Sequence, residues 1–253
     1  MRQSLAGQGP CRGRWLSFAS ALTGALLAYT GTVGAHVPMR AAQQAAAQPG
    51  QELVLLARAH TPRSAPRSDA PALAAVGARR PITGERTVLP LLGRAADVHG
   101  TTWLRVLLPG RPNSHAGWIR ANATSSARTP WRIRVNTTAR KLSAYKNGRL
   151  IRTFKAVVGK LSTPTPTGKF FVEESIALNS DEVGAPYALA LSARSEALRK
   201  FAGGPGQIAL HGLMNVGGIP GTATSHGCIR LDNATMRWLV ARIGPGVPVA
   251  ITR

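Results

Sequence analysis

Short strand-like runs, separated by turn residues, fill the chain from residue 131 to its C-terminus and limit its fold more than any other feature. They lie at residues 131–135, 141–145, 150–158, 169–172, 188–191, 207–210 and 247–251. In the first run apolar and basic residues alternate, which is typical of a half-buried strand. Asn147-Gly148 separates the second run from the third, and this pair between two such runs predicts a tight hairpin. We therefore expect a mainly β fold.

Helical periodicity is confined to a short stretch near the C-terminus. The apolar residues at helical spacing are Met236, Leu239, Val240 and Ile243. Either Asp232 or Asn233 can cap the start of this helix, and Gly244 is expected to end it. Residues 130–253 are thus predicted to form one domain, mostly β with one or two short helices.

A second group of strand-like runs lies nearer the N-terminus, at residues 87–89, 102–108 and 117–119, with Gly, Pro and Asn between them. Short strands at this spacing suggest a small barrel. Residues 81–124 resemble a bacterial SH3-like domain, chiefly through Trp103-Leu104-Arg105-Val106 and Gly117-Trp118-Ile119. Trp103 and Trp118 are interpreted as core residues, with the lining of a ligand groove as the alternative.

Residues 36–80 are rich in Ala, Gln, Pro and Arg and show no sustained period. We interpret most of this segment as a linker, with a strand at Glu52–Ala57. Residues 124–130 are predicted to be a polar break between the two domains.

Residues 1–35 have the three-part layout of a secretory signal. A basic region holds Arg2, Arg12 and Arg14, an uncharged stretch runs from Leu16 to Ala28, and Val33-Gly34-Ala35 supplies small residues for cleavage. Extended through Ala35, the uncharged stretch has about 20 residues, so an uncleaved membrane anchor is the alternative. Either way we expect an exported, extracytoplasmic protein, secreted or anchored.

The chain carries 32 lysines and arginines against 10 aspartates and glutamates, a net charge of +22. Such a field attracts polyanions, either nucleic acid or an anionic cell envelope. No compact basic run interleaved with aromatic residues indicates a nucleic-acid face, and the leader makes a nucleic-acid partner improbable. Two interpretations stay open: attraction to an anionic envelope, or a compositional bias of the genome, since most of the excess is Arg scattered among Ala, Gly and Pro.

Cys228 is the one cysteine that remains if the leader with Cys11 is removed. A solitary thiol in an exported protein suggests intermolecular pairing or a reactive group, and no second cysteine exists to build a cysteine-rich metal site. A thiol attacks as the thiolate, which a nearby imidazole can generate. The sequence therefore makes Cys228 a candidate nucleophile.

Three histidines are candidates for the base that takes the proton of this thiol. His226 is two residues from the cysteine, His211 closes a predicted strand, and His115 is more remote. His211 fits best, because a base on a separate strand can be aimed independently. Gly227 lets the backbone approach a substrate closely and present N–H groups to an oxyanion. Arg230 supplies a permanent cation suited to a carboxylate.

The motifs around these residues resemble the L,D-transpeptidase catalytic domain, also called the YkuD-type domain. The resemblance covers about residues 131–252 and rests on Ile208-Ala209-Leu210-His211-Gly212, Ser225-His226-Gly227-Cys228-Ile229-Arg230-Leu231 and the turn Thr163-Pro164-Thr165-Pro166-Thr167-Gly168. It implies a β-sandwich-like fold and cysteine acyl transfer on peptidoglycan stem peptides.

The resemblance also implies a role for each motif residue. Cys228 would be the nucleophile and His211 the general base, with the imidazole oriented by the carbonyl of Gly212. The backbone N–H groups of Gly227 and Cys228 would form the oxyanion hole.

Four further residues are expected around the substrate. His226 would shape the site, Arg230 would hold the donor stem or a local loop, and Ser225 would stabilise the turn, with direct substrate contact as the alternative. Tyr187 lies where the family often places an aromatic residue near the donor groove.

The implied reaction releases D-Ala from a tetrapeptide stem and passes the acyl group from Cys228 to an amine of another stem, giving a 3→3 cross-link. Neither a metal nor an organic cofactor is expected, and carbapenem-type β-lactams should acylate the thiol. One alternative is an L,D-carboxypeptidase, in which water resolves the same thioester. Another is a non-catalytic envelope-binding protein built on the SH3-like segment and the positive charge.

Overall fold

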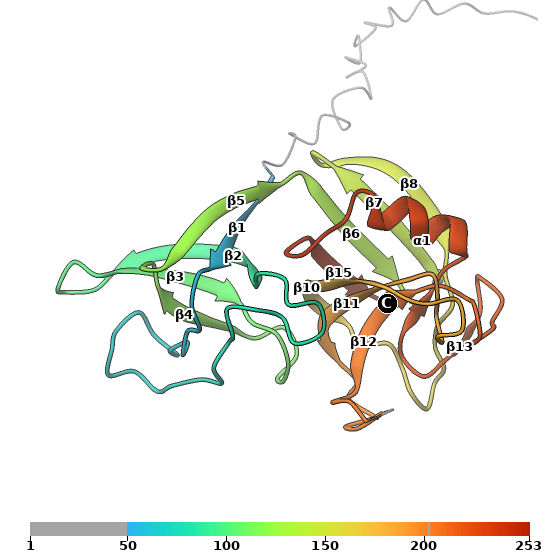
Figure 1. Cartoon of the computed structure of the whole chain (residues 1–253), viewed down its shortest axis with the longest axis horizontal. Helices are drawn as coiled ribbons and strands as arrows, with labels where there is room; N and C mark the ends of the chain where they lie inside the picture. The colour runs from blue at the N-terminus through green and yellow to red at the C-terminus, as the bar shows by residue number, and fades with distance from the viewer. Residues whose placement is uncertain (1–49, 202) are drawn as a thin grey trace, which may run out of the picture. The chain divides into compact units, whose positions relative to one another are not determined.

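The computed structural model describes residues 50–201 and 203–253, so the expected leader and residues 36–49 of the expected linker lie outside it. Within these residues the chain is mainly β, as predicted, with a five-stranded sheet, an eight-stranded sheet, a two-stranded ladder and one α-helix (Figure 1). No helix in this part of the chain is long and apolar enough to cross a membrane.

The five-stranded sheet has the order β4-β3-β2-β1-β5 and is antiparallel throughout. Its strands are β1 (Gln51–Leu56), β2 (Val88–Ala96), β3 (Thr102–Leu107), β4 (Ala116–Arg120) and β5 (Thr124–Thr129). Buried side chains from four of them, including Val54, Leu89, Val106 and Ile119, share one core. No ladder joins β4 to β5 within the described residues.

One of our expectations for this region is confirmed and one needs correction. The strand predicted at Glu52–Ala57 is β1, which lies between β2 and β5 and buries Leu53, Val54 and Leu56. The polar break predicted after residue 124 is instead β5, which forms the edge of the sheet. An edge strand needs no apolar face towards solvent, and its backbone pairs with β1 over the whole length of both strands.

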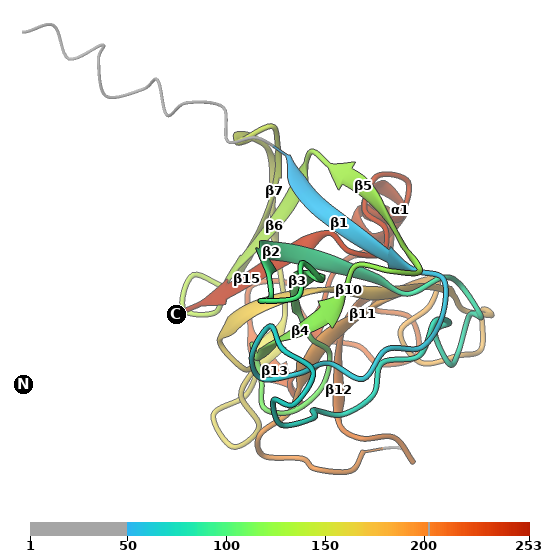
Figure 2. The same ribbon diagram turned by 90° about the vertical axis from the view of Figure 1, so that its left-hand side faces the viewer.

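The segment between β1 and β2 has little regular structure but is pinned to the sheet. Arg63 exchanges backbone hydrogen bonds with Trp118 of β4, beside which the segment passes (Figure 2). Trp103 is 2% exposed, as predicted for a core residue, and its Nε1 donates to Asp97 at 2.9 Å. Trp118 is only partly buried.

The eight-stranded sheet has the order β14-β12-β11-β10-β15-β6-β7-β8. Its strands are β6 (Trp131–Asn136), β7 (Lys141–Lys146), β8 (Arg149–Lys155), β10 (Gly168–Ala177), β11 (Tyr187–Arg194), β12 (Gln207–His211), β14 (Ile229–Arg230) and β15 (Pro248–Thr252). The predicted hairpin is confirmed: β7 and β8 are joined by Asn147 and Gly148, both with positive φ (50° and 78°), as a type I′ turn requires.

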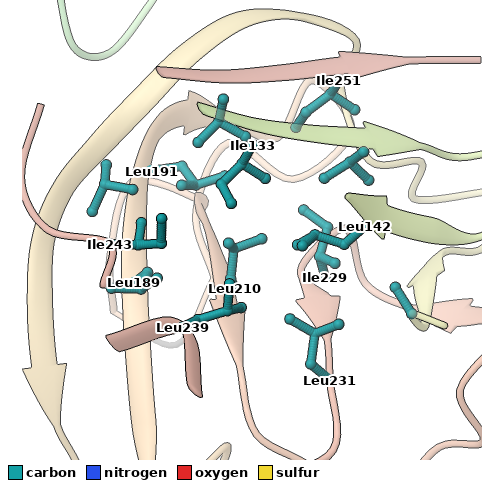
Figure 3. Close-up of a cluster of buried hydrophobic side chains, with 14 of the residues drawn as sticks. Ile133, Leu142, Leu189, Leu191, Leu210, Ile229, Leu231, Leu239, Ile243 and Ile251 are labelled. Atoms are coloured by element: carbon teal, nitrogen blue, oxygen red, sulfur yellow. The ribbon is translucent and has the colours of Figure 1, made fainter. Parts of the chain in front are cut away.

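One apolar core takes residues from both ends of this strand order. Ile133 and Leu142 come from β6 and β7, and Leu210 and Ile229 come from β12 and β14, yet all four belong to the same buried cluster (Figure 3). The eight-stranded sheet therefore bends around one shared core.

The helix α1 (Asn233–Val240) covers part of this core with Met236 and Leu239. Asp232 is the N-cap, because its carboxylate accepts from the Thr235 N–H at 2.7 Å. The helix ends at Val240, earlier than the predicted end at Gly244. The residues between these two positions form a turn, in which the N–H groups of Arg242 and Ile243 donate to the carbonyl of Leu239.

Candidate active site

Cys228 and His211 are brought together by two neighbouring parallel strands. In the register of β12 and β14, Leu210 is level with Ile229, so Cys228, one residue earlier, is level with Ala209. Side chains alternate along a strand, so Ala209, His211 and Cys228 share one face, opposite the buried Leu210 and Ile229. The β-sheet thus places the candidate nucleophile and its candidate base on the same surface.

The thiol is half-buried against the strand that carries the histidine. Sγ of Cys228 lies 3.9 Å from the carbonyl oxygen of Gln207, at the start of β12. Cys228 is a free cysteine.

The imidazole of His211 is oriented by the backbone. Its Nδ1 lies 2.8 Å from the carbonyl oxygen of Gly212. Because a carbonyl oxygen only accepts, Nδ1 must carry the hydrogen, which leaves Nε2 with its lone pair as the basic atom. This is the arrangement that the sequence motif implied for Gly212.

Two glycines hold the loop that packs against this histidine. Gly184 has φ +88°, and a Cβ there would lie 2.5 Å from Nδ1 of His211. Its carbonyl accepts the Gly212 N–H at 2.7 Å, and a Cβ on Gly212 would overlap the carbonyl of Ala185. Gly184 was not found from the sequence, since nothing in its own neighbourhood indicates contact with a residue 27 positions away (211 − 184).

Burial shifts the pKa values of both groups towards their neutral forms. It lowers the pKa of His211, although the hydrogen bond with Gly212 acts in the opposite direction and the charge of Arg230 lowers it further. Burial raises the pKa of Cys228, opposed by a backbone hydrogen bond with Ala209 and by Arg230. Both shifts favour the neutral thiol and the neutral imidazole.

Ser225 stabilises the turn that holds Cys228, the candidate nucleophile. Its buried hydroxyl donates to the carbonyl of Cys228 at 2.6 Å and accepts the N–H of Gly227 at 3.1 Å. Gly227 has φ +122°, which favours glycine at this position. The Gly227 N–H, one of the two expected oxyanion donors, is thus already used within the turn, whereas the Cys228 N–H, the other candidate donor, has no partner in the described residues.

The threonine- and proline-rich turn supports the same loop from the other side. Thr165 Oγ1 donates to the carbonyl of Gly227 at 2.8 Å and accepts the N–H of Gly159 at 2.9 Å. Thr163 Oγ1 donates to the carbonyl of Ser225 at 3.3 Å. Here the short strands β9 (Val158–Gly159) and β13 (Ala223–Ser225) run parallel. The sequence indicated this turn but not its contacts with the loop that holds Ser225, Gly227 and Cys228.

His226 and Arg230 differ in their exposure to solvent. His226 is exposed and its ring stacks on Phe201, with centroids 5.7 Å apart. Arg230 is only 9% exposed, and its Nη1 donates to the carbonyls of Val216 and Gly217, both at 3.2 Å. Of the two expected roles of Arg230, its contacts match the one that holds a local loop.

The remaining candidates are divided between the two sheets. Tyr187 begins β11, packs partly buried on the core, and precedes Ala188, which is level with His211. His115 lies before β4 in the five-stranded sheet, where its Nδ1 is 2.5 Å from the carbonyl oxygen of Pro112. In residues 50–201 and 203–253 no group of three or more His, Cys, Asp or Glu side chains could hold a metal ion.

Comparison with known proteins places this site in a family. The L,D-transpeptidase catalytic domain family, YkuD, matches residues 130–251. The protein YkuD of Bacillus licheniformis, provisionally named an L,D-transpeptidase, is 30% identical over 165 residues, 62% of this chain and 90% of that protein. YkuD of Bacillus subtilis (strain 168), with the same provisional name, is 29% identical over 148 residues, 58% of this chain and 74% of its own length.

The structure of Bd1075 from Bdellovibrio bacteriovorus is 25% identical, with a TM-score of 0.39, over 49% of this chain and 48% of that one. This chain therefore spans about half of Bd1075. From the sequence relatives, the chain belongs to the L,D-transpeptidase family, and residues 130–251 are its catalytic domain.

Proposed function

We propose that this protein is a peptidoglycan L,D-transpeptidase that forms 3→3 cross-links through a thioester on Cys228. The observation that carries the proposal is the shared face of β12 and β14, on which the thiol and the oriented imidazole of His211 lie together. The substrate follows from the family, whose name specifies transfer across an L,D peptide bond.

In the first half-reaction Sγ of Cys228 attacks the carbonyl carbon before the terminal D-Ala of a donor stem. The thiol proton passes to Nε2 of His211, and the oxyanion receives the N–H of Cys228. As the tetrahedral intermediate collapses, the peptide C–N bond breaks. His211 returns the proton to the departing amine, so D-Ala leaves and a thioester remains.

In the second half-reaction the amine of an acceptor stem attacks the thioester carbonyl. His211 takes a proton from that amine, the C–S bond breaks, and the thiol is restored by proton return. Water in place of the amine would give the carboxypeptidase reaction by the same steps, with Cys228 unchanged in its role.

Incubation of the purified protein with disaccharide-tetrapeptide fragments tests this assignment, with products identified by mass spectrometry. Cross-linked dimers with release of D-Ala are expected from the native chain and none from Cys228→Ala. Tripeptide monomers without dimers would make the protein a carboxypeptidase. Equal wall modification by the native chain and Cys228→Ala would overturn the catalytic assignment in favour of a non-catalytic envelope-binding protein.

Carbapenem-type β-lactams are proposed to acylate the same thiol, because their strained amide carbonyl offers it an equivalent electrophile. Mass spectrometry should find one adduct on the native chain and none on Cys228→Ala. An adduct on both would contradict attack by this residue.

We also propose that residues 1–35 export the chain to the cell envelope. Fractionation of the producing cell, followed by N-terminal sequencing, is expected to find the protein outside the cytoplasm, either cut after Ala35 or retained with the leader as an anchor. A cytoplasmic chain with an intact N-terminus would contradict this.

The five strands β1–β5 support the further proposal of an SH3-like unit before the catalytic domain. An experimental structure in which β4 closes on β5 would support a barrel, and a sheet that stays open would contradict it.

A further inference from the structure

A pocket of about 400 Å³ lies beside the five-stranded sheet, and none of the candidate active-site residues lines it. It is formed where the chain leaves β1, beside the ends of β3 and β4. Three arginines line it, Arg58, Arg63 and Arg120, and no carboxylate does. Its volume is in the range of small-molecule sites.

The three guanidinium groups have no acidic partner among the described residues. Arg63 Nη1 donates to the carbonyl of Ala70 at 3.1 Å, which fixes the side chain without neutralising it. Arg120 stacks over the Trp103 ring with its guanidinium carbon 5.6 Å from the centroid, and Arg58 makes no ion pair within this part of the chain. On β2 of the same sheet, by contrast, Arg94 forms an ion pair with Glu52 at 2.8 Å.

A buried histidine adds a second, independent indication. His60 lines the pocket and is 8% exposed, yet its buried Nε2 has no hydrogen-bond partner in the described residues. Burial lowers the pKa of His60, so at neutral pH its ring is uncharged and one ring nitrogen is an acceptor. The pocket thus combines a hydrogen-bond acceptor, His60, with three arginine cations. This combination suits a ligand that has both a hydroxyl donor and an anionic group.

The remaining polar lining has the same character. Thr61, Ser68 and Asn122 face the pocket, and their side chains form no hydrogen bond within the described residues. Hydroxyl and amide groups of this kind pair with sugar hydroxyls, while arginine forks pair with phosphate or carboxylate oxygens. We propose that the pocket binds an acidic saccharide, a sugar that bears a phosphate or a carboxylate group.

Calorimetric titration of the full-length protein tests the proposal with three probes: glucose 6-phosphate, glucuronate and glucose. Binding of at least one acidic sugar, with none of glucose, is expected. Preference for glucose 6-phosphate would identify phosphate as the recognised group, and preference for glucuronate would identify carboxylate. Failure of both acidic sugars to bind, or equal binding of glucose, would overturn the proposal.

Matched variants separate this pocket from the general positive charge. The double variant Arg58→Gln/Arg120→Gln should weaken acidic-sugar binding about tenfold or more, since hydrogen bonds to charged groups are lost. Arg86→Gln/Arg105→Gln removes the same charge from exposed positions outside the pocket and should leave affinity unchanged. Equal weakening by both pairs would overturn the assignment.

The catalytic site supplies a folding control. Both double variants should still form the carbapenem adduct at Cys228, because neither alters the eight-stranded sheet. An adduct in the variants together with lost sugar binding confines the effect to the pocket, whether or not the proposed cross-linking activity is found.

Discussion

At the scale of single residues, uncharged groups hold the candidate site in place. The carbonyl of Gly212 fixes the tautomer of His211, and the hydroxyl of Ser225 fixes the turn at Cys228. Neither contact needs an ionised side chain, so the lack of an acid in the third position does not weaken the site. Burial then disfavours both charged forms.

The ionisation of Cys228 can be tested by alkylation with iodoacetamide, mapped to the Cys228 peptide in a Cys11→Ser background. Because burial raises the pKa of this thiol, the alkylation rate should rise with pH through a pKa above that of N-acetylcysteine. A reactive plateau at acidic pH would instead indicate a thiolate–imidazolium pair and contradict the neutral resting state.

Gly184→Ala tests the packing against the imidazole. The new Cβ would meet Nδ1 of His211, so the ring must shift, and kcat/KM should fall about 10-fold to 100-fold because a small misplacement of a catalytic group is costly. Gly100→Ala is the matched control, since its φ is +76° and no atom lies within 4 Å of the position that its new methyl group would take.

Both variants should lose roughly 1–2 kcal/mol of unfolding free energy from the positive φ alone. Activity should fall only in Gly184→Ala. Equal loss of activity in both would show that backbone strain, and not contact with His211, is responsible.

At the scale of elements, the loop that holds Gly227 and Cys228 depends on a turn far from it in sequence. Thr165 joins the N–H of Gly159 to the carbonyl of Gly227, so the loop before β14 is tied to the strand β9. The candidate site is therefore built from three separate segments: this turn, the end of β12 and the start of β14.

Thr165→Val should loosen that tie while keeping the side-chain shape. Two buried backbone groups lose their partner, so the unfolding free energy should fall by about 1–3 kcal/mol. Turnover should fall about tenfold or more as the thiol loses its position. Denaturant unfolding and the stem-peptide assay measure the two effects. Thr167→Val, at an exposed position of the same turn, is the control, and an equal effect there would contradict the role of Thr165.

Local chemistry made some elements predictable and left others hidden. Asn147-Gly148 and Asp232 act on their own neighbours, so the hairpin and the helix start could be found from the sequence. β5 was missed because an edge strand with polar side chains shows no alternation of apolar and polar residues. The contacts of Gly184 with His211 and of Thr165 with Gly227 were missed because they join segments that are distant in sequence.

At the scale of the whole chain, several of the acidic residues are engaged by partners within the described residues. Glu52 pairs with Arg94 and Arg128, mainly through side-chain hydrogen bonds that lower its pKa to about 2. Asp97 accepts from Trp103, and Asp232 caps the helix. The chain has 32 lysines and arginines against 10 aspartates and glutamates, and a net charge of +22 favours anionic partners.

The two sheets are joined by a buried ionic network. Arg80, from the segment before β2, forms an ion pair with Glu173 of β10, and Glu173 forms a second ion pair with Arg194 at 3.1 Å. The neighbouring Glu174 accepts the N–H groups of Ile82 and Thr83, at 3.2 and 2.9 Å. The side chains of Glu173 and Glu174 are almost wholly buried, so their charges depend on these partners.

Arg80→Met tests whether this network holds the two sheets together. Removing one partner leaves Glu173 buried with Arg194 alone, and the unfolding free energy should fall by about 3–5 kcal/mol, the usual cost of breaking a buried ion pair. Arg79→Met, its exposed neighbour, should change stability little. If Arg80→Met were no less stable than Arg79→Met in denaturant unfolding, apolar contacts alone would join the sheets.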